Sequence, residues 1–520
     1  MPDGNGVIQQ ALQLLKLKRV DDAIAFCQKK INNCPQQLEL KIVLSHAYQQ
    51  KGLFDKMFNI AQQACQIDNN HFAAAVRYIE CAIYCSQVHK AIYLNDKMAK
   101  RHSKDATKLA KIAELYLHLG QHQKVANTHQ KAVDLMPNNP IYLYNLAAAK
   151  INTGELIKSQ KLLKQLIKIA PKDFDAYNMR SGLITANKEK NHTAELQQLL
   201  LQNRNTPRAT IALGFALAKE YEDLGEHQKS WAYLENANQV RKNHLSYRIE
   251  NDTDAIGHIV QTINQDSLGQ RKPSYCKQVP IFILGLPRSG STLTDRILSS
   301  HTQVSSLGEI DALAFALMHC VGEHQGKKQL IESSIQINFN DLAKKYTQAT
   351  RGYGLTETHL IDKTPLNFLY LGLIKKAFPY AKIIHVKRHP MDSCYAIYKT
   401  LFRMGYPFSY SLDDLASYYI SYTKIMQHWK KCFDSSFYEL NYEDLVNDTE
   451  NTAKKLLNYC QLKWTPKVLT MHKNRTPTAT ASAVQVRQDI YTTSVAKWKN
   501  HSKALQGLKS QLELAGINCG

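Results

Sequence analysis

The stretch that decides the fold is VPIFILGLPRSGSTLTDRILSSHTQVSSLGE, residues 279–309. It opens with an apolar, β-branched run at 281–284, which predicts a short buried strand. A turn with two glycines and one arginine follows at 285–290, and from Ser291 the apolar residues recur at helical spacing. A strand, a glycine turn and a helix in this order direct backbone N–H groups and the helix dipole at a bound phosphate. The stretch therefore predicts a phosphate-binding loop.

The turn differs from a Walker A loop, G-x-x-x-x-G-K-[ST], in the position of its cation. Gly285 and Gly290 have the Walker spacing, yet Ser291 and Thr292 follow directly and the lysine is missing. The cation of the turn is Arg288, inside it. A nucleotide kinase depends on that lysine, so a kinase with an altered loop remains only an alternative.

The motif PRSGSTL, residues 287–293, resembles the 5′-phosphosulfate loop of sulfotransferases that use 3′-phosphoadenosine 5′-phosphosulfate (PAPS). The resemblance is to the tyrosylprotein sulfotransferase branch and to bacterial proteins that join such a domain to tetratricopeptide repeats. It implies that PAPS is the co-substrate and that a sulfuryl group passes to an acceptor hydroxyl. The loop residues that it implies as nucleotide contacts are Pro287, Arg288, Ser289, Gly290, Ser291 and Thr292.

A carboxylate stands where this branch has its general base. Glu309 lies 21 residues after Arg288, at the matching distance. Sulfuryl transfer to a hydroxyl needs a proton acceptor near the attacking oxygen, and such help is typically worth ~10²–10⁴ in rate. The resemblance therefore implies that Glu309 is the base.

A lysine stands where the family stabilises the leaving group. Lys363 lies in the sequence Asp-Lys-Thr-Pro, and Arg388 follows it by 25 residues, as in the family. The resemblance implies that Lys363 and Arg288 neutralise the charge that develops on the departing phosphate, a large contribution in transfers of this type. Cytosolic sulfotransferases carry a catalytic histidine two residues after this lysine. Pro365 occupies that position here and favours the glutamate-base branch.

The sequence after the predicted strand at 382–386 implies a site for the 3′-phosphate of PAPS. Arg388 matches the arginine that binds this phosphate, and no aspartate ends the strand to hold magnesium as in a kinase, so we expect no metal. The family's serine, eight residues later, is replaced by Ala396, and Ser393 is the expected substitute. Tyr442 matches a cofactor-contacting tyrosine, although a core aromatic remains an alternative.

Residues 481–498 match the closing segment of the family. Ser482 aligns with a serine that assists the leaving group, and Lys497 aligns with a phosphate-contacting lysine. We expect the segment to fold over the bound nucleotide and to exclude water.

The first half of the chain repeats with a period of 34 residues. Turn-forming residues share two registers, which are Pro35, Asn69, Ser103, Pro137 and Pro171 in one and Gly52, Gly120 and Gly154 in the other. The pattern resembles the tetratricopeptide repeat and predicts about seven helix pairs, the sixth degenerate and the last, near Gly225, out of register. Such an array offers a groove for a protein or peptide, for which Tyr48, Tyr78, Tyr144 and Asn145 are candidate lining residues. A structural extension or a homodimer surface is the alternative use of the array.

Composition supports a globular protein with an anionic partner. The chain has 66 Lys and Arg against 44 Asp and Glu, a formal net charge of +22, but no arginine-rich arm, so nucleic-acid binding is disfavoured. The eleven cysteines form neither a disulfide nor a zinc pattern. No leader is visible at the amino terminus and no run approaches ~18 apolar residues, so we expect a cytoplasmic protein without a transmembrane segment.

These patterns predict an all-α tetratricopeptide-repeat solenoid at 7–264, a linker at 265–277 and an α/β parallel-sheet sulfotransferase domain of P-loop-like type at 278–515. The expected reaction is PAPS-dependent transfer, with a protein or peptide tyrosine as the favoured acceptor. A small-molecule, lipid or saccharide hydroxyl is an alternative acceptor. A catalytically dead scaffold, in which only the repeats act, is an alternative for the whole chain.

Overall fold

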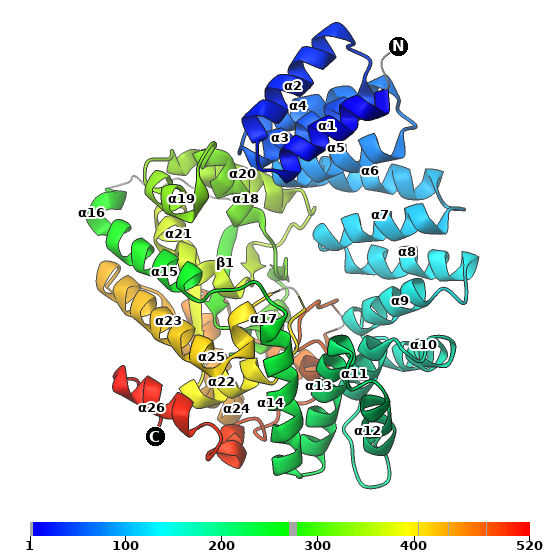
Figure 1. Cartoon of the computed structure of the whole chain (residues 1–520). Coiled ribbons are helices and arrows are strands. Elements are labelled where there is room, and N and C mark those ends of the chain that lie inside the picture. The colour runs from blue at the N-terminus through cyan, green and yellow to red at the C-terminus, as the bar shows by residue number, and fades with distance from the viewer. Residues whose placement is uncertain (1–3, 270–277, 404, 435, 475) are drawn as a thin grey trace.

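The computed structural model describes residues 4–269, 278–403, 405–434, 436–474 and 476–520. Within them, a helical array forms the N-terminal half and a parallel sheet covered by helices forms the C-terminal half (Figure 1). Most of the predicted linker, 270–277, lies outside the described residues. The predicted fold class, a helical array followed by a parallel α/β domain, is confirmed.

The sheet has the strand order β2-β3-β1-β4-β5 with every pair parallel. The two strands predicted downstream of the loop are present as β4 and β5, whereas β2 and β3 were not predicted. The bounds are β1 Val279–Gly285, β2 Val304–Ser306, β3 His359–Asp362, β4 Lys382–Lys387 and β5 Tyr438–Asn441.

Alternate residues of β1 pack on opposite faces of the sheet, as the period of a strand requires. Ile281 and Ile283 join a core with α17 (Ser291–Ser299) and α25 (Thr449–Tyr459). Phe282 and Leu284 join the larger core on the other face. The remaining helices of this half are α18 Ala312–Val321, α19 Gly326–Ser334, α20 Phe339–Arg351, α21 Leu371–Ala377, α22 Pro390–Tyr398, α23 Leu412–Cys432, α24 Tyr442–Asn447 and α26 Gln506–Leu514, with the 3₁₀ turns η1 Pro365–Tyr370, η2 Pro407–Tyr410, η3 Pro466–Lys473, η4 Gln485–Arg487 and η5 Lys497–His501.

The order of the strands fixes the place of the ligand. β1 lies between β3 and β4, so the chain leaves it in one direction for β2 and β3 and returns on its other side as β4. Parallel sheets bind ligands at such a point, beyond the carboxyl ends of the strands. The loop after β1 therefore occupies the expected binding crevice.

The N-terminal half contains seven antiparallel helix pairs, as predicted, and the sixth pair is short. The pairs are α1 Gly4–Lys16 with α2 Val20–Asn33, α3 Leu38–Gln50 with α4 Phe54–Ile67, α5 Phe72–Tyr84 with α6 Val88–Arg101, α7 Ala106–His118 with α8 His122–Leu135, α9 Pro140–Asn152 with α10 Leu156–Ile169, α11 Phe174–Gly182 with α12 Thr193–Gln202, and α13 Pro207–Asp223 with α14 His227–Asn243.

The turn inside each of the first five pairs carries a residue with positive φ, at intervals of 34 residues. These residues are Lys18, Gly52, Ser86, Gly120 and Gly154, with φ from 59° to 83°. Glycine adopts this backbone without strain, which explains the predicted glycine register. Lys18 and Ser86 occupy the same position without being glycine, and this is why the register has gaps in the sequence.

The helix α15 (Glu250–Thr262), which was expected to end the array, packs against α19 and α23 of the sheet half. Its buried Ile256 and Ile259 belong to the core that also contains Phe282 of β1. Asn264 caps the short helix α16 (Gln265–Leu268) that follows. The boundary at 264 remains a prediction, and the packing of α15 favours one nearer the end of α14.

The array curves beside the sheet half and contacts it at both ends (Figure 1). Near its start, the ring of Tyr84 lies 4.7 Å from that of Phe315. Near its end, Trp231 stacks on Tyr398 at 5.6 Å. The array is therefore packed onto the second half along its length.

The candidate groove residues have different positions. Tyr48 and Tyr78 are buried in the core of the first repeats, so they are packing residues. Tyr144 lies beneath Arg403 of the sheet half, with 4.9 Å between the guanidinium and the ring centroid.

In the part of the chain that the structure describes, every helix is too short or too polar to cross a membrane. The same residues contain no group of three or more His, Cys, Asp or Glu side chains that is able to hold a metal ion.

Candidate functional site

The phosphate-binding loop joins β1 to α17, as the sequence predicts. Arg288 has a φ of 66° and Gly290 a φ of 105°, so the loop contains two left-handed residues. A Cβ at Gly290 would lie 2.5 Å from Cδ2 of Tyr442. Only glycine permits this approach between the loop and α24.

The closing segment lies over this loop. Nη1 of Arg288 donates a hydrogen bond to Oγ of Ser482, and Nη2 donates to Oε1 of Gln485 at 2.7 Å. The hydroxyls of Thr292 and Thr480 are 3.4 Å apart. Burial, together with the neighbouring charge of Arg388, lowers the pKa of Arg288 to about 10, so it stays charged at neutral pH. The predicted pairing of Arg288 with Ser482 is thus present in space.

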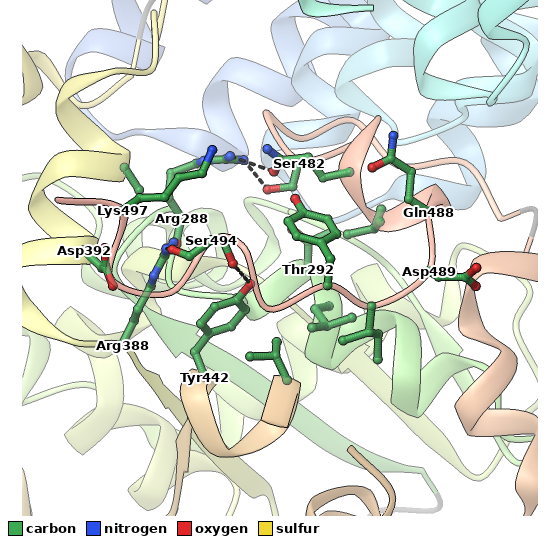
Figure 2. A pocket seen from close by; sticks show the side chains of 18 of the residues that line it. Arg288, Thr292, Arg388, Asp392, Tyr442, Ser482, Gln488, Asp489, Ser494 and Lys497 are labelled. Atoms are coloured by element: carbon green, nitrogen blue, oxygen red, sulfur yellow. Dashed lines mark hydrogen bonds between the residues drawn. The ribbon is translucent and has the colours of Figure 1, made fainter. Parts of the chain in front are cut away.

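Arg388, at the end of β4, connects the loop to the last part of the closing segment. Its Nη1 donates to the carbonyl of Arg288 at 3.1 Å and its Nη2 to the carbonyl of Ser494 at 2.7 Å. The guanidinium lies 4.8 Å from the ring centroid of Tyr442, whose hydroxyl is 2.7 Å from Oγ of Ser494. Figure 2 shows Arg288, Arg388 and Lys497 on one side of this pocket. The predicted nucleotide contacts Arg388 and Tyr442 therefore lie together.

The pocket between these groups has the features that a nucleotide requires. It has a volume of about 110 Å³ and adjoins a second cavity of about 450 Å³, with which it shares Arg288, Tyr395, Lys399 and Lys497. In the described part of the chain, the buried Nε atoms of Arg288 and Arg388 have no hydrogen-bond partner. Unpaired guanidinium donors suit phosphate oxygens. Apolar side chains suited to a purine ring line the pocket as well, namely Leu293, Val446, Met471 and Ile490.

Glu309 and Lys363 form an ion pair on the other side of the loop. Glu309 follows β2, Lys363 follows β3, and Nζ of Lys363 donates to Oε1 of Glu309. The backbone N–H of Lys363 donates to the carbonyl of Gly308 at 2.9 Å, which fixes the two segments to each other. The two residues predicted to be the base and the leaving-group cation are thus in direct contact.

This ion pair lies in a separate cavity of about 280 Å³. One wall comes from the closing segment, including Thr480, and another from the turn of the fourth repeat, including Leu117 and His122. Thr292 lines the nucleotide pocket and contacts Thr480 of this cavity. The loop and the closing segment therefore divide two neighbouring cavities, one cationic and one with the carboxylate.

A buried carboxyl group holds the segment that carries Lys363. Asp362 accepts hydrogen bonds from Oγ1 of Thr364 at 2.8 Å, Nδ2 of Asn367 at 3.1 Å and the hydroxyl of Tyr346 at 3.2 Å. Complete burial raises the pKa of Asp362 to about 7, although these hydrogen bonds oppose the shift. Asp362 therefore fixes the turn from within the core.

Two predicted residues lie elsewhere. Oγ of Ser393 donates to the carbonyl of Arg388 at 3.3 Å and faces a different cavity, whereas Ala396 lines the nucleotide pocket. The expected replacement of the family serine by Ser393 is thus not supported by its position. Arg487 donates to the carbonyl of Asn152 in the fifth repeat at 2.8 Å and does not line the nucleotide pocket.

Lys497 lines the nucleotide pocket, as expected, but its partner was not predicted. Its Nζ is 3.6 Å from a carboxylate oxygen of Glu222, on α13 of the array. Two other residues near it also escaped prediction. Asp392 accepts hydrogen bonds from the backbone N–H groups of Ala496 at 2.6 Å and Trp498 at 3.2 Å, and Lys399 lies three residues after Ala396.

Only part of this was detectable in the sequence. Lys399 is three residues from Ala396, a spacing that helical geometry brings to one face, so the search for a substitute cation should have reached it. Glu222 lies in a different repeat, and no local pattern distinguishes it.

Comparison with known proteins agrees with this geometry. Residues 280–466 match the family model described as "Sulfotransferase family". An uncharacterized protein of Aquifex aeolicus is 29% identical over 401 residues, which cover 74% of this chain and 51% of the relative. Protein-tyrosine sulfotransferase 1 of Danio rerio is 28% identical over 206 residues, or 38% of this chain and 57% of the relative. The chain thus spans little more than half the length of these two relatives.

A further relative and two solved structures are also similar. The omega-hydroxy-beta-dihydromenaquinone-9 sulfotransferase of Mycobacterium bovis is 31% identical over 111 residues, 20% of this chain and 29% of the relative. The sulfotransferase domain of the Synechococcus olefin synthase aligns with 48% of this chain and 99% of its own, at 20% identity and a TM-score of 0.34. A tetratricopeptide-repeat protein of Thermus thermophilus aligns with 35% of this chain and 98% of its own, at 16% identity and a TM-score of 0.27.

The family match covers the sheet, the phosphate-binding loop, Glu309, Lys363 and Arg388. Residues 280–466 therefore form a domain of the sulfotransferase family, carried on an array of tetratricopeptide repeats.

Proposed function

We propose that this chain transfers the sulfuryl group of PAPS to an acceptor hydroxyl, with Glu309 as the general base. The observation that carries the proposal is the ion pair of Glu309 and Lys363 beside the loop of Arg288. These residues come from three different strand ends, and the sequence motifs assign them the base, the leaving-group cation and the phosphosulfate ligand. Their meeting at one edge of the sheet supports a single reaction centre.

On the nucleotide side, the residues of the loop hold the 5′ end of the nucleotide, and Arg388 holds its 3′-phosphate. PAPS supplies the activated sulfuryl group, and its adenosine 3′,5′-diphosphate portion is the leaving group. Arg288 and Lys363 offer positive charge where negative charge increases as the sulfur–oxygen bond breaks, and Ser482 orients Arg288 through its hydroxyl. The closing segment excludes water from this end of the site.

On the acceptor side, Glu309 removes the proton of the attacking hydroxyl. Its side chain is 39% exposed, whereas that of Lys363 is 1% exposed. The carboxylate is therefore open to the cavity while the ammonium remains inside. This arrangement lets an acceptor oxygen approach Glu309 from the cavity and leaves Lys363 facing the site of bond cleavage.

The favoured acceptor is a tyrosine in a protein or peptide. The relative from Danio rerio is named for this reaction. The cavity with Glu309 has a wall from the fourth repeat, at Leu117, Gly120 and His122, so the array borders the place where the acceptor hydroxyl must enter. A repeat array is a common platform for peptide chains.

A lipid hydroxyl is the second candidate acceptor, because a separate apolar cavity lies close to the ion pair. Its volume is about 350 Å³, and its walls include Ile259 and Leu366, the second of which lies three residues after Lys363. Tyr406 also lines it, and burial together with the nearby charge of Glu309 raises the pKa of that phenol. The mycobacterial relative is named for a menaquinone acceptor, a molecule with a long apolar chain.

The test uses the full chain and PAPS labelled with ³⁵S, offered with tyrosine peptides and with hydroxylated lipids in detergent. Wild-type protein should label at least one class, and Glu309→Gln should reduce the rate by about 10²–10⁴-fold while leaving nucleotide binding intact. Glu357→Gln, before the opposite end of β3, is the matched control and should retain the wild-type rate. Binding of adenosine 3′,5′-diphosphate without any transfer would favour the scaffold, and phosphate transfer from ATP would favour the kinase.

A further inference from the structure

A carboxylate of the repeat array reaches the nucleotide pocket. Glu222, on α13, accepts hydrogen bonds from Nζ of Lys399 at 2.8 and 2.9 Å and from the hydroxyl of Tyr395 at 2.6 Å. Nζ of Lys497 lies 3.6 Å from the same carboxylate. All three partners line the nucleotide pocket, and the side chain of Glu222 is only 12% exposed. A buried carboxylate with two lysines and a phenol forms a constructed cluster rather than a chance surface contact.

We infer that Glu222 is a positioning residue of the nucleotide site, supplied by the seventh repeat, and that it orients Lys399 and Lys497 toward the 3′-phosphate of the bound nucleotide. The inference rests on the proposed function, since it assumes a nucleotide with a 3′-phosphate. It adds Lys399 as a ligand-binding residue and makes the array part of the catalytic unit.

The position of Lys399 explains how the 3′-phosphate is bound in spite of Ala396. Ala396 lines the pocket where the family has a serine, and it offers no hydrogen bond. Lys399 lies almost one helical turn further along the same segment and lines the same pocket. Its ammonium replaces a neutral hydroxyl with a full charge. Together with Arg388, it provides two cations on neighbouring parts of the pocket wall.

Glu222 is needed because the pocket concentrates positive charge. Burial and the charges of Lys497 and Arg288 lower the pKa of Lys399 to about 8, while Glu222 opposes this decrease. Despite the cost of burial, Lys399 and Lys497 lower the pKa of Glu222 to about 2, so its carboxylate is ionised at neutral pH. Without Glu222, Lys399 would lose its proton at a lower pH. The charged and titratable groups around Lys399 are Lys219, Glu222 and Asp223 on α13, Tyr395 on α22, Arg288 in the loop, and Lys497 and His501 of η5.

The test compares the binding of adenosine 3′,5′-diphosphate and adenosine 5′-monophosphate by calorimetry, because only the first has a 3′-phosphate. Wild-type protein should prefer the diphosphate by tenfold or more, and its affinity for the diphosphate should decrease as the pH rises through about 8. Lys399→Met should remove most of the preference without changing the affinity for the monophosphate. Glu222→Gln should reduce the preference and move the decrease in affinity to lower pH. In the transfer assay, the KM for PAPS should rise while kcat changes little.

Two variants control for a general effect on folding. Asp223→Asn changes the adjacent carboxylate of α13, which pairs with Lys219 at 2.6 Å, and should leave the preference unchanged. Ala396→Ser in the Lys399→Met background should restore part of the preference, which a damaged fold would not allow. Equal effects of Glu222→Gln and Asp223→Asn, or an unchanged preference in Lys399→Met, would overturn the inference. Failure of wild-type protein to bind either nucleotide would instead count against the proposed function.

Discussion

Glu309 and Lys363 are joined in an ion pair that spans the carboxyl ends of the neighbouring strands β2 and β3. The lysine is buried and the carboxylate is partly exposed, so each faces a different side of the site. A cation that lies between the base and the phosphate-binding loop is suited to act in the transition state. Its removal should therefore affect the chemical step more than binding.

Lys363→Met should reduce kcat and kcat/KM together by at least about 100-fold, because the lost charge stabilises mainly the transition state. The affinity for adenosine 3′,5′-diphosphate should change much less. Steady-state kinetics with labelled PAPS measure the first effect and calorimetry the second. Lys387→Met, at the end of β4 and 3.6 Å from Glu439, is the control and should behave as wild type. A rise in KM alone would assign Lys363 to binding instead.

Ser482→Ala should reduce kcat about tenfold because Arg288 loses one of the two acceptors that orient its guanidinium. Arg288→Lys should cost more, since lysine cannot donate to Ser482 and Gln485 in the same fork. Residues that act as a unit are not additive, so the double variant should be hardly slower than Arg288→Lys alone. Fully additive losses in kcat would mean that the serine acts independently of the arginine.

Gly154→Ala should weaken nucleotide binding through the closing segment. A Cβ at Gly154 would lie 2.5 Å from Nη1 of Arg487, which must then leave its acceptor on Asn152. The positive φ of 83° adds about 1–2 kcal/mol of backbone strain. Gly225→Ala separates the two effects, since it has a φ of 76° and no atom within 4 Å of its Cβ. Both variants should lose similar stability in thermal unfolding, and only Gly154→Ala should raise the KM for PAPS.

Asp362→Asn should change how stability depends on pH. Burial raises the pKa of Asp362 to about 7 from 3.8, so the folded state keeps a proton that the unfolded chain releases above about pH 4. The stability contributed by this carboxyl group is therefore fully present below about pH 4 and is lost as the pH rises to about 7. Relative to the variant, the wild-type protein should lose melting temperature over that interval. The exposed Asp254→Asn should follow the wild-type curve, and parallel curves for Asp362→Asn would contradict this assignment.

The sequence contained enough local information to predict the strand, loop and helix at 279–299 and the 34-residue period, because both depend on short-range periodicity and glycine backbone geometry. The residues after those elements were also predicted, since Glu309, Lys363 and Arg388 directly follow strand ends. β2 and β3 escaped prediction because three or four residues give almost no alternating pattern. Their place is fixed by pairing with β1 across long stretches of chain.

Long-range packing determined the rest. Ser393 and Ala396 were distinguishable only once the orientation of α22 was known, since the helix turns one toward the nucleotide pocket and the other toward a different cavity. The partnership of Glu222 with Lys399 joins residues 177 positions apart in two halves of the chain. No pattern within either half indicates that the halves share a site.

The carbonyl of Asn152 accepts hydrogen bonds from the backbone N–H of Thr478 at 2.9 Å and from Arg487 at 2.8 Å. A fragment trimmed to the C-terminal half would lose this double anchor together with the carboxylate of Glu222. Its lid would be untethered and its basic cluster uncompensated, even though every residue of the family match would still be present. Truncation at the interdomain junction is therefore a poor route to a working minimal enzyme.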